Sequence, residues 1–120
     1  MQWGDLKVWK QAHALVLEIY KITSSFPNSE TYGITSQLRR ASSSIAANIV
    51  EGQSRNSTKD YVNFLYISRG SLEETRYFLL LSRDLRYLPT ESYKRVEAVA
   101  ISVSKMLNGL IASLKTQQAP

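Results

Sequence analysis

Residues 93–114 read YKRVEAVAISVSKMLNGLIASL, and this stretch decides the fold. Its apolar side chains recur at alternating spacings of three and four, which is the period of one face of an α-helix. The pattern runs without a slip through Tyr93, Val96, Ala100, Val103, Leu107, Leu110 and Leu114. Such a seam is typical of coiled-coil-like packing. The stretch therefore predicts a helix over about 90–114 that packs against other helices.

Three more segments upstream have the same helical period, at about 5–25, 34–51 and 58–87. Loop-forming residues separate them, with Pro27 after the first helix, a polar run at 53–57 after the second, and Pro89 after the third. Helices joined by such short links lie antiparallel to their neighbours. The sequence predicts an all-α fold, an antiparallel up-down-up-down four-helix bundle that forms a single domain over residues 1–120.

The helix ends carry capping signals. Asp5 and Thr90 are candidate N-caps for the first and fourth helices, and Gly52 is a natural stop for the second. Ser57, with Asp60 three residues later, resembles a capping box that opens the third helix. We expect residues 116–120 to fray.

The composition bears on partners and location. The chain has 15 Lys and Arg against 10 Asp and Glu, a net charge of +5 that favours a polyanion such as RNA or DNA. It has no basic tail, so the fold must assemble any anion-binding patch. The absence of cysteine suits the cytoplasm, where we expect the protein to reside. No stretch approaches the roughly 18 consecutive apolar residues of a membrane-spanning helix, so we expect no membrane association.

The inventory of catalytic residues is thin. The single histidine, His13, falls on the apolar stripe of the first helix, which favours a core-edge imidazole over a ligand or base. Glu73 and Glu74 point about 100° apart on a helix, and Glu51 belongs to another segment. We therefore predict no catalytic residues, no metal and no cofactor. A magnesium-dependent enzyme is the least favoured hypothesis, since it requires carboxylates from different helices to converge.

A polar row follows the edge of the apolar faces of the second and third helices. It consists of Gln37, Ser44, Asn48, Glu51, Ser71 and Glu74. One interpretation is a hydrogen-bond network that fixes the helix register, and the other is a ligand pocket in the bundle. On the first interpretation, we expect Asn48 to be buried and hydrogen-bonded to another helix.

Basic residues give candidate contacts to a nucleic acid. Arg69, Arg76 and Arg83 repeat every seven residues, so they form one line along the third helix that could follow a phosphate backbone. Glu73 lies between the first two, so an ion-paired, solvated face is the alternative. The candidate nucleic-acid contacts are Arg39, Arg40, Arg55, Lys59, Arg69, Arg76 and Arg83.

The run 77–81 is apolar all around the third helix, which a single bundle with one solvated face cannot cover. Such a patch usually marks a protein interface, although scattered surface apolar residues are the alternative. The candidate interface residues of an oligomer are Tyr66, Tyr77, Leu80 and Leu81.

Several segments, in this order, resemble one family over about residues 5–90. They are Leu6-Lys7-Val8-Trp9-Lys10-Gln11-Ala12, Phe26-Pro27 with Glu30 and Tyr32-Gly33, Gln37-Leu38-Arg39-Arg40-Ala41, Ser44-Ile45, Asn48-Ile49-Val50-Glu51-Gly52 and Gly70-Ser71-Leu72-Glu73-Glu74. The chain is similar to the four-helix-bundle proteins encoded in intervening sequences of bacterial large-subunit ribosomal RNA genes. The Asn-Ile-x-Glu-Gly segment is the most specific part, and Val50 departs from the alanine that is commoner there.

This resemblance implies an antiparallel bundle, a ring-shaped homopentamer, and relatives that serve retroelement reverse transcriptases as basic, RNA-associated accessory proteins. It implies no established biochemical activity. Our leading hypothesis is a non-enzymatic, oligomeric binding protein that associates with RNA or with a nucleic-acid enzyme. The main rival is a purely structural self-assembling bundle, whose charge serves solubility alone.

Overall fold

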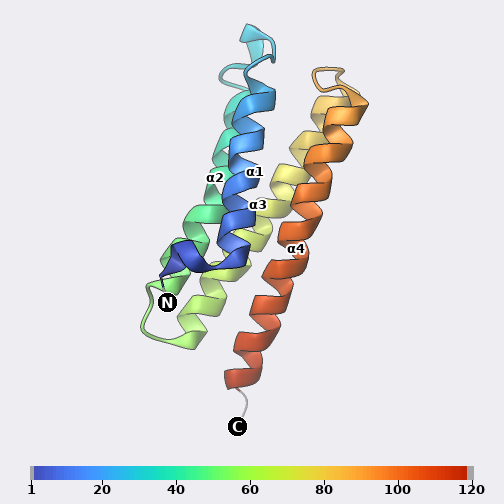
Figure 1. Ribbon diagram of the computed structural model, residues 1–120. Coiled ribbons are helices and arrows are strands. Elements are labelled where there is room, and N and C mark those ends of the chain that lie inside the picture. Colours follow the sequence, from blue (N-terminus) through green and yellow to red (C-terminus); the bar gives the residue numbers. More distant parts are fainter. Residues whose placement is uncertain (1, 119–120) are drawn as a thin grey trace.

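The computed structural model of the protein describes residues 2–118, and it is a bundle of four long helices. These are α1 (Lys7–Thr23), α2 (Ile34–Gln53), α3 (Thr58–Asp84) and α4 (Thr90–Gln118), with short 3-10 turns at Trp3–Asp5 and Asn28–Glu30. The chain runs up, down, up and down along a molecule of 51 × 23 × 21 Å (Figure 1). Each helix packs against two neighbours, in the cyclic order α1, α2, α3, α4. The predicted four-helix bundle is confirmed.

The N-terminal ends of α1 and α4 each differ by one residue from the predicted caps. Asp5 is not the N-cap of α1, because it belongs to the 3-10 turn, and the Leu6 carbonyl accepts the first helical bond from Lys10 N–H at 3.0 Å. Similarly, the Pro89 carbonyl accepts from Tyr93 N–H at 2.9 Å, which makes Thr90 the first residue of α4 instead of its cap. Residues 116–118, which we expected to fray, continue α4, and 119–120 lie outside the described residues.

The two ends of α3 have well-defined caps. The Ser57 hydroxyl oxygen accepts a bond from Asp60 N–H at 3.1 Å, as predicted. At the other end, α3 stops at Asp84, three residues before the predicted boundary. Arg86 has φ 64°, and the Arg86 and Tyr87 N–H groups bond back to the carbonyls of Arg83 and Ser82, both at 2.9 Å. This is the Schellman arrangement, in which glycine usually occupies the left-handed position.

The core is one column of aliphatic side chains from all four helices, interleaved on α3 with small hydroxyl residues. Ser68, Thr75 and Ser82 are completely buried, and they alternate along the helix with the buried Leu65, Leu72 and Leu79. The Ser68 hydroxyl donates to the Ile45 carbonyl of α2 at 2.8 Å, while Thr75 and Ser82 bond to carbonyls of α3 itself. Buried polar groups need such partners. Small residues on this seam let α2 and α3 pack closely.

Gly52 lies where α2 passes close to α3. A Cβ at this position would lie 2.8 Å from Tyr61 Cδ1 and 3.0 Å from Phe64 Cβ, both on α3. Gly52 does not stop α2, which continues through Gln53. Its structural role is therefore to leave room for α3, and the sequence-based interpretation as a helix stop is wrong.

By length and composition alone, α4 could cross a bilayer, because an 18-residue window reaches a mean hydropathy of 1.3. The same helix supplies Val96, Ala100, Val103 and Leu107 to the core of the bundle, although only 28% of that window is buried. Core helices commonly share this composition.

Candidate functional site

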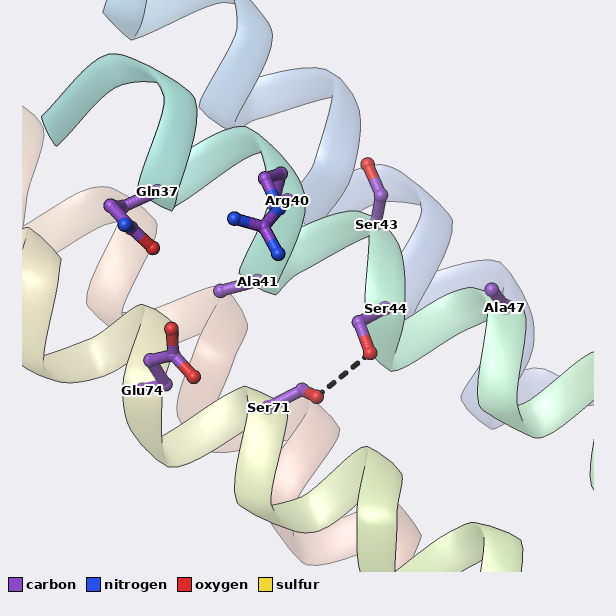
Figure 2. Close-up of a pocket in the computed structure, with 8 residues that line it drawn as sticks. All are labelled: Gln37, Arg40, Ala41, Ser43, Ser44, Ala47, Ser71 and Glu74. Atoms are coloured by element: carbon purple, nitrogen blue, oxygen red, sulfur yellow. Dashed lines mark hydrogen bonds between the residues drawn. The ribbon is translucent and has the colours of Figure 1, made fainter. Parts of the chain in front are cut away.

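A groove of about 560 Å³ runs along the outside of the contact between α2 and α3. Its floor is made of small side chains, and longer polar ones stand at its edges (Figure 2). The groove is lined by Gln37, Arg40, Ala41, Ser43, Ser44, Ala47, Ser71 and Glu74. Four of the six residues of the predicted polar row therefore meet here.

A chain of hydrogen bonds crosses the floor. Ser71 donates its hydroxyl to Ser44 Oγ at 2.9 Å, which joins α3 to α2 (Figure 2). Asn48 lies one turn beyond, half-buried, and its amide donates to the Ser44 carbonyl at 2.8 Å and to Ser44 Oγ at 2.9 Å. We expected Asn48 to bond directly to another helix. It bonds within α2 instead, because Ser44 stands one turn away, and Ser44 makes the connection to α3.

Glu51 also belongs to the predicted row, but it takes no part in this hydrogen-bond network. Its carboxylate pairs with Arg55 at 2.9 Å, and the Arg55 guanidinium lies over the Phe64 ring at 4.6 Å. The pair is exposed and four residues apart in sequence, a geometry worth a few tenths of a kcal/mol, about 0.3–0.5.

The polar edges of the groove have no partners within the described chain. Gln37 and Arg40 extend from α2 and Glu74 from α3, all three exposed (Figure 2). None of the three side chains makes a hydrogen bond or an ion pair with another described residue. The groove thus presents one cation, one anion and one amide to whatever contacts it.

A second polar connection, which no pattern in the sequence predicts, joins two turns at the opposite end from the chain termini. The Glu30 carboxylate accepts from Ile34 N–H at 3.2 Å, at the start of α2, and from the Tyr87 hydroxyl at 2.9 Å. The Tyr87 ring also packs on Phe26, with centroids 5.7 Å apart. The bond to Glu30 raises the pKa of Tyr87, and partial desolvation adds to the effect. These residues have a structural role.

Arg39 is also structural. Its Nε donates to the Thr23 hydroxyl at 3.0 Å, Nη2 donates to the Tyr20 carbonyl at 3.4 Å, and the guanidinium lies over the Tyr20 ring at 4.5 Å. These contacts fasten α2 to the end of α1. Arg39, predicted as a contact to nucleic acid, is therefore occupied within the fold.

The three arginines that repeat every seven residues, Arg69, Arg76 and Arg83, lie along the contact between α3 and α4. Arg76 bonds to Glu97 at 2.8 Å and to Glu73 at 3.1 Å, and the bond to Glu97 is the main cause of its raised pKa. Arg83 pairs with Asp84 at 3.0 Å. Arg69 alone has no carboxylate partner in the described chain. It donates to the Asn108 side chain at 3.2 Å and lies over Tyr66, 4.8 Å from the ring centroid.

Net positive charge is concentrated at one end of the bundle, where Figure 1 places the α2–α3 turn and both termini. We call this the basic end and define it as residues 2–13, 45–70 and 104–118. Its seven Lys and Arg minus three Asp and Glu give +4, whereas the remaining residues, 14–44 and 71–103, carry eight minus seven, or +1. Within the described chain, six cations of the basic end have no carboxylate partner. They are Lys7, Lys10, Lys59, Arg69, Lys105 and Lys115.

The four candidate interface residues are separated by the fold. Tyr77, 57% exposed, and the half-buried Leu80 line a shallow groove of about 250 Å³ between α3 and α4, beside Glu73, Arg76, Tyr93 and Glu97. Tyr66 and Leu81 pack against the hydrophobic core instead. Only Tyr77 and Leu80 therefore remain together as an apolar edge on the outside of α3.

His13 is exposed instead of lying at the edge of the core, and its ring stacks on Trp9 with centroids 5.0 Å apart. Residues 2–118 contain no group of three or more His, Cys, Asp and Glu side chains placed to hold a metal ion. The convergence of carboxylates that a magnesium-dependent enzyme requires is therefore missing from this part of the chain.

The fold and these surfaces define a class of protein: a small antiparallel four-helix bundle whose polar residues gather on outer grooves and at one basic end. A family model for 23S rRNA-intervening sequence proteins matches residues 4–109, and the chain belongs to this family. A crystal structure of a protein of unknown function from the S23 ribosomal protein family of Bacteroides thetaiotaomicron VPI-5482 is similar, with 26% identity and a TM-score of 0.78. The match covers 87% of this chain and 97% of that one. No curated protein matches.

Proposed function

We propose that this protein is a non-enzymatic, self-assembling binding protein that associates with RNA through its basic end. The observation that carries the proposal is the segregation of net charge: the basic end carries +4 and the remaining described residues +1, and six of the seven cations at the basic end have no carboxylate partner. A cation that is already paired inside the protein has little attraction left for phosphate, while an unpaired one retains it.

The aromatic residues of the basic end support the same ligand. Arg69 and Lys115 both lie over the ring of Tyr66, at 4.8 and 6.0 Å from its centroid. Trp3 is exposed and packs edge-on against Trp9. Basic side chains interleaved with aromatic rings are typical of surfaces that bind single-stranded nucleic acids, where bases stack and phosphates pair with cations.

The test is a salt series of binding to a generic single-stranded RNA, followed by fluorescence anisotropy. We expect affinity to fall steeply between low and moderate salt, and the double variant Lys105→Ala with Lys115→Ala to flatten the slope of log K against log salt by about 1–2. The matched control is Arg86→Ala with Lys94→Ala at the other end, which removes the same charge and should leave the slope unchanged. The proposal fails if the natural protein binds no RNA at low salt.

A purely structural role in self-assembly is the second candidate function, and the exposed apolar edge of Tyr77 and Leu80 favours it. In that case the net charge serves solubility only. A protein that assembles in light scattering and yet binds no RNA at any salt concentration would support this candidate over the first.

A further inference from the structure

We propose that a groove between the end of α1 and the start of α2 binds a nucleotide, with the phosphate on Arg40 and Thr35 and the base on Tyr32. The groove has a volume of about 380 Å³ and is lined by two tyrosines, two arginines and four hydroxyl residues. Small-molecule sites have volumes of about 300–1,000 Å³. The groove lies at the end of the bundle opposite the termini (Figure 1), so the proposal is independent of the basic end and of RNA binding there.

Thr35 is the observation that points to a ligand. Five of the six buried hydroxyl residues that the structure describes donate to a backbone carbonyl, namely Thr23, Ser42, Ser68, Thr75 and Ser82. Thr35 is the sixth. It is only 8% exposed and lines the groove, and its hydroxyl has no hydrogen-bond partner among the described residues. Because buried hydroxyl groups normally have a partner, this one is available to a molecule in the groove.

The charges along the groove favour an anion. Its lining contains Arg39 and Arg40 and no carboxylate. The Thr23 hydroxyl and the Tyr20 carbonyl hold Arg39 in place at one wall. Arg40 stands between this groove and the α2–α3 groove, and it has no partner among the described residues. A guanidinium in this state is free to bind a phosphate group, which it can contact through two N–H donors at once.

The first turn of α2 strengthens this preference. Thr35 and Ser36 are the second and third residues of a 20-residue helix, and the dipole of such a helix attracts anions to its N-terminal end. Glu30, in the preceding turn, does not line the groove. Both of its carboxylate oxygens already accept hydrogen bonds, from the Ile34 N–H and from the Tyr87 hydroxyl.

Hydroxyl groups beside Arg40 match the several oxygens of a phosphate. Ser36 and Ser43 lie four residues before and three residues after Arg40, on the same side of α2. Both line the groove, and neither side chain makes a hydrogen bond within the described chain. A phosphate group can accept from a guanidinium and from two or three hydroxyls together, which a single carboxylate does less completely.

The tyrosines add a surface for an aromatic ring. Tyr32 borders the groove and is 96% exposed, so its ring is free to stack. The Tyr20 ring is covered by the Arg39 guanidinium, 4.5 Å from its centroid. Bases of any sequence stack on exposed aromatic rings. A ligand that joins such a ring to a phosphate is a nucleotide.

The test is isothermal titration calorimetry of the natural protein with AMP, GMP, CMP and UMP. The nucleotide that binds best is then compared with its two fragments, the nucleoside and inorganic phosphate. We expect the nucleotide to bind at least about tenfold more tightly than either fragment, because one molecule brings both groups to the groove together.

Variants assign the contacts. Arg40→Met should weaken nucleotide binding about tenfold or more, whereas Arg83→Met removes a charge outside the groove and should not weaken it. Tyr32→Ala should weaken binding about fivefold or more, and Tyr77→Ala, at an exposed tyrosine outside the groove, should not.

Thr35→Val keeps the shape of the side chain and removes the hydroxyl, so it should weaken binding about fivefold. Circular dichroism verifies the helical content of each variant. Tyr32→Ala changes a side chain that the fold leaves exposed, so it tests the groove even where Thr35→Val fails to fold.

A free nucleotide and the phosphorylated end of an RNA carry the same group. Displacement of the bound nucleotide by a short RNA with a terminal phosphate, but not by the same RNA with a terminal hydroxyl, would support the RNA end as the ligand. Displacement by neither would support the free nucleotide.

Three results would overturn the proposal. Binding of no nucleotide at millimolar concentration would remove the site. Equal losses in Arg40→Met and Arg83→Met would attribute binding to net charge. Inorganic phosphate that binds as tightly as the nucleotide would exclude the stacking role of Tyr32, and with it the nucleotide as the class of ligand.

Discussion

Tyr87 donates its hydroxyl to Glu30 at 2.9 Å, although the two residues are 57 positions apart in the sequence. The same carboxylate accepts the Ile34 N–H at the start of α2. One side chain thus holds the turn between α1 and α2, the first turn of α2, and the turn between α3 and α4. The end of the bundle opposite the termini is fixed by this junction.

Replacing Tyr87 with Phe should lower the midpoint of urea unfolding at neutral pH, because the junction loses its hydrogen bond. The pKa of Tyr87 is raised above its ordinary value of about 10, chiefly by the bond to Glu30. The protonated hydroxyl is therefore the form that the fold stabilises, so its contribution is complete below about pH 10 and is lost as the pH rises through the raised pKa. The midpoints of the two proteins should converge above pH 10. Tyr32→Phe, at a position 96% exposed, should show no difference at any pH.

Replacing Gly52 with Ala should destabilise the protein by about 1–3 kcal/mol, the range for overpacking a close contact. The new Cβ collides with Tyr61 and Phe64, and this outweighs the gain in helix propensity. Gly109→Ala is the matched control, because the space around it is open, and it should stabilise the monomeric fold by up to about 1 kcal/mol. Opposite signs in chemical denaturation support the packing role of Gly52, and equal signs would contradict it.

Arg86→Gly should stabilise the protein by about 0.5–1 kcal/mol, because Arg86 adopts a left-handed backbone at φ 64° that costs energy for any residue with a Cβ. Arg86→Ala removes the same charge and keeps the strain, so it should leave stability nearly unchanged. A rise in thermal midpoint for the alanine variant as large as for glycine would attribute the effect to charge instead of backbone.

Arg76→Met should cost about 1–3 kcal/mol, because it leaves the largely buried Glu97 without its cation. One oxygen of that carboxylate, Oε2, already lacks a hydrogen-bond partner. Arg83→Met breaks a more exposed pair with Asp84 and should change stability by less than about 0.5 kcal/mol. The double variant Arg76→Met with Glu97→Met should regain most of the loss. A cost that persists in the double variant would show that the guanidinium acts through packing alone.

The fold could be predicted because the evidence for it is local. The spacing of apolar residues in 93–114 specifies a helix with one buried face, and Pro27 and Pro89 mark breaks that short links must bridge. The ends of helices were less predictable. The carbonyls that accept the first helical hydrogen bonds of α1 and α4 belong to Leu6 and Pro89, each one residue away from the predicted caps, Asp5 and Thr90. Gly52 is the clearest case, because its role depends on α3, which follows in the sequence.

The candidate site was predicted only in part, for a related reason. The polar row was visible as a helical pattern, and Ser44 and Ser71 do meet across helices. The hydrogen-bond partner of each arginine could not be predicted, because partners such as Glu97 for Arg76 and Asn108 for Arg69 lie 21 and 39 residues away in the sequence. Helical spacing shows which residues share a face of one helix, and only the packed bundle shows which partner each one finds.

The separation of charge along the 51 Å bundle gives each chain an electric dipole, whose positive pole is the basic end. In a ring with cyclic symmetry, every chain places this pole at an equivalent position, so the positive poles gather on one side of the ring if the bundles run along the symmetry axis. In that arrangement, the ring that the family resemblance implies would carry a positive rim, and a polyanion long enough to touch several subunits at once would be held by avidity. Weak contacts by single chains would then suffice for tight binding by the assembly.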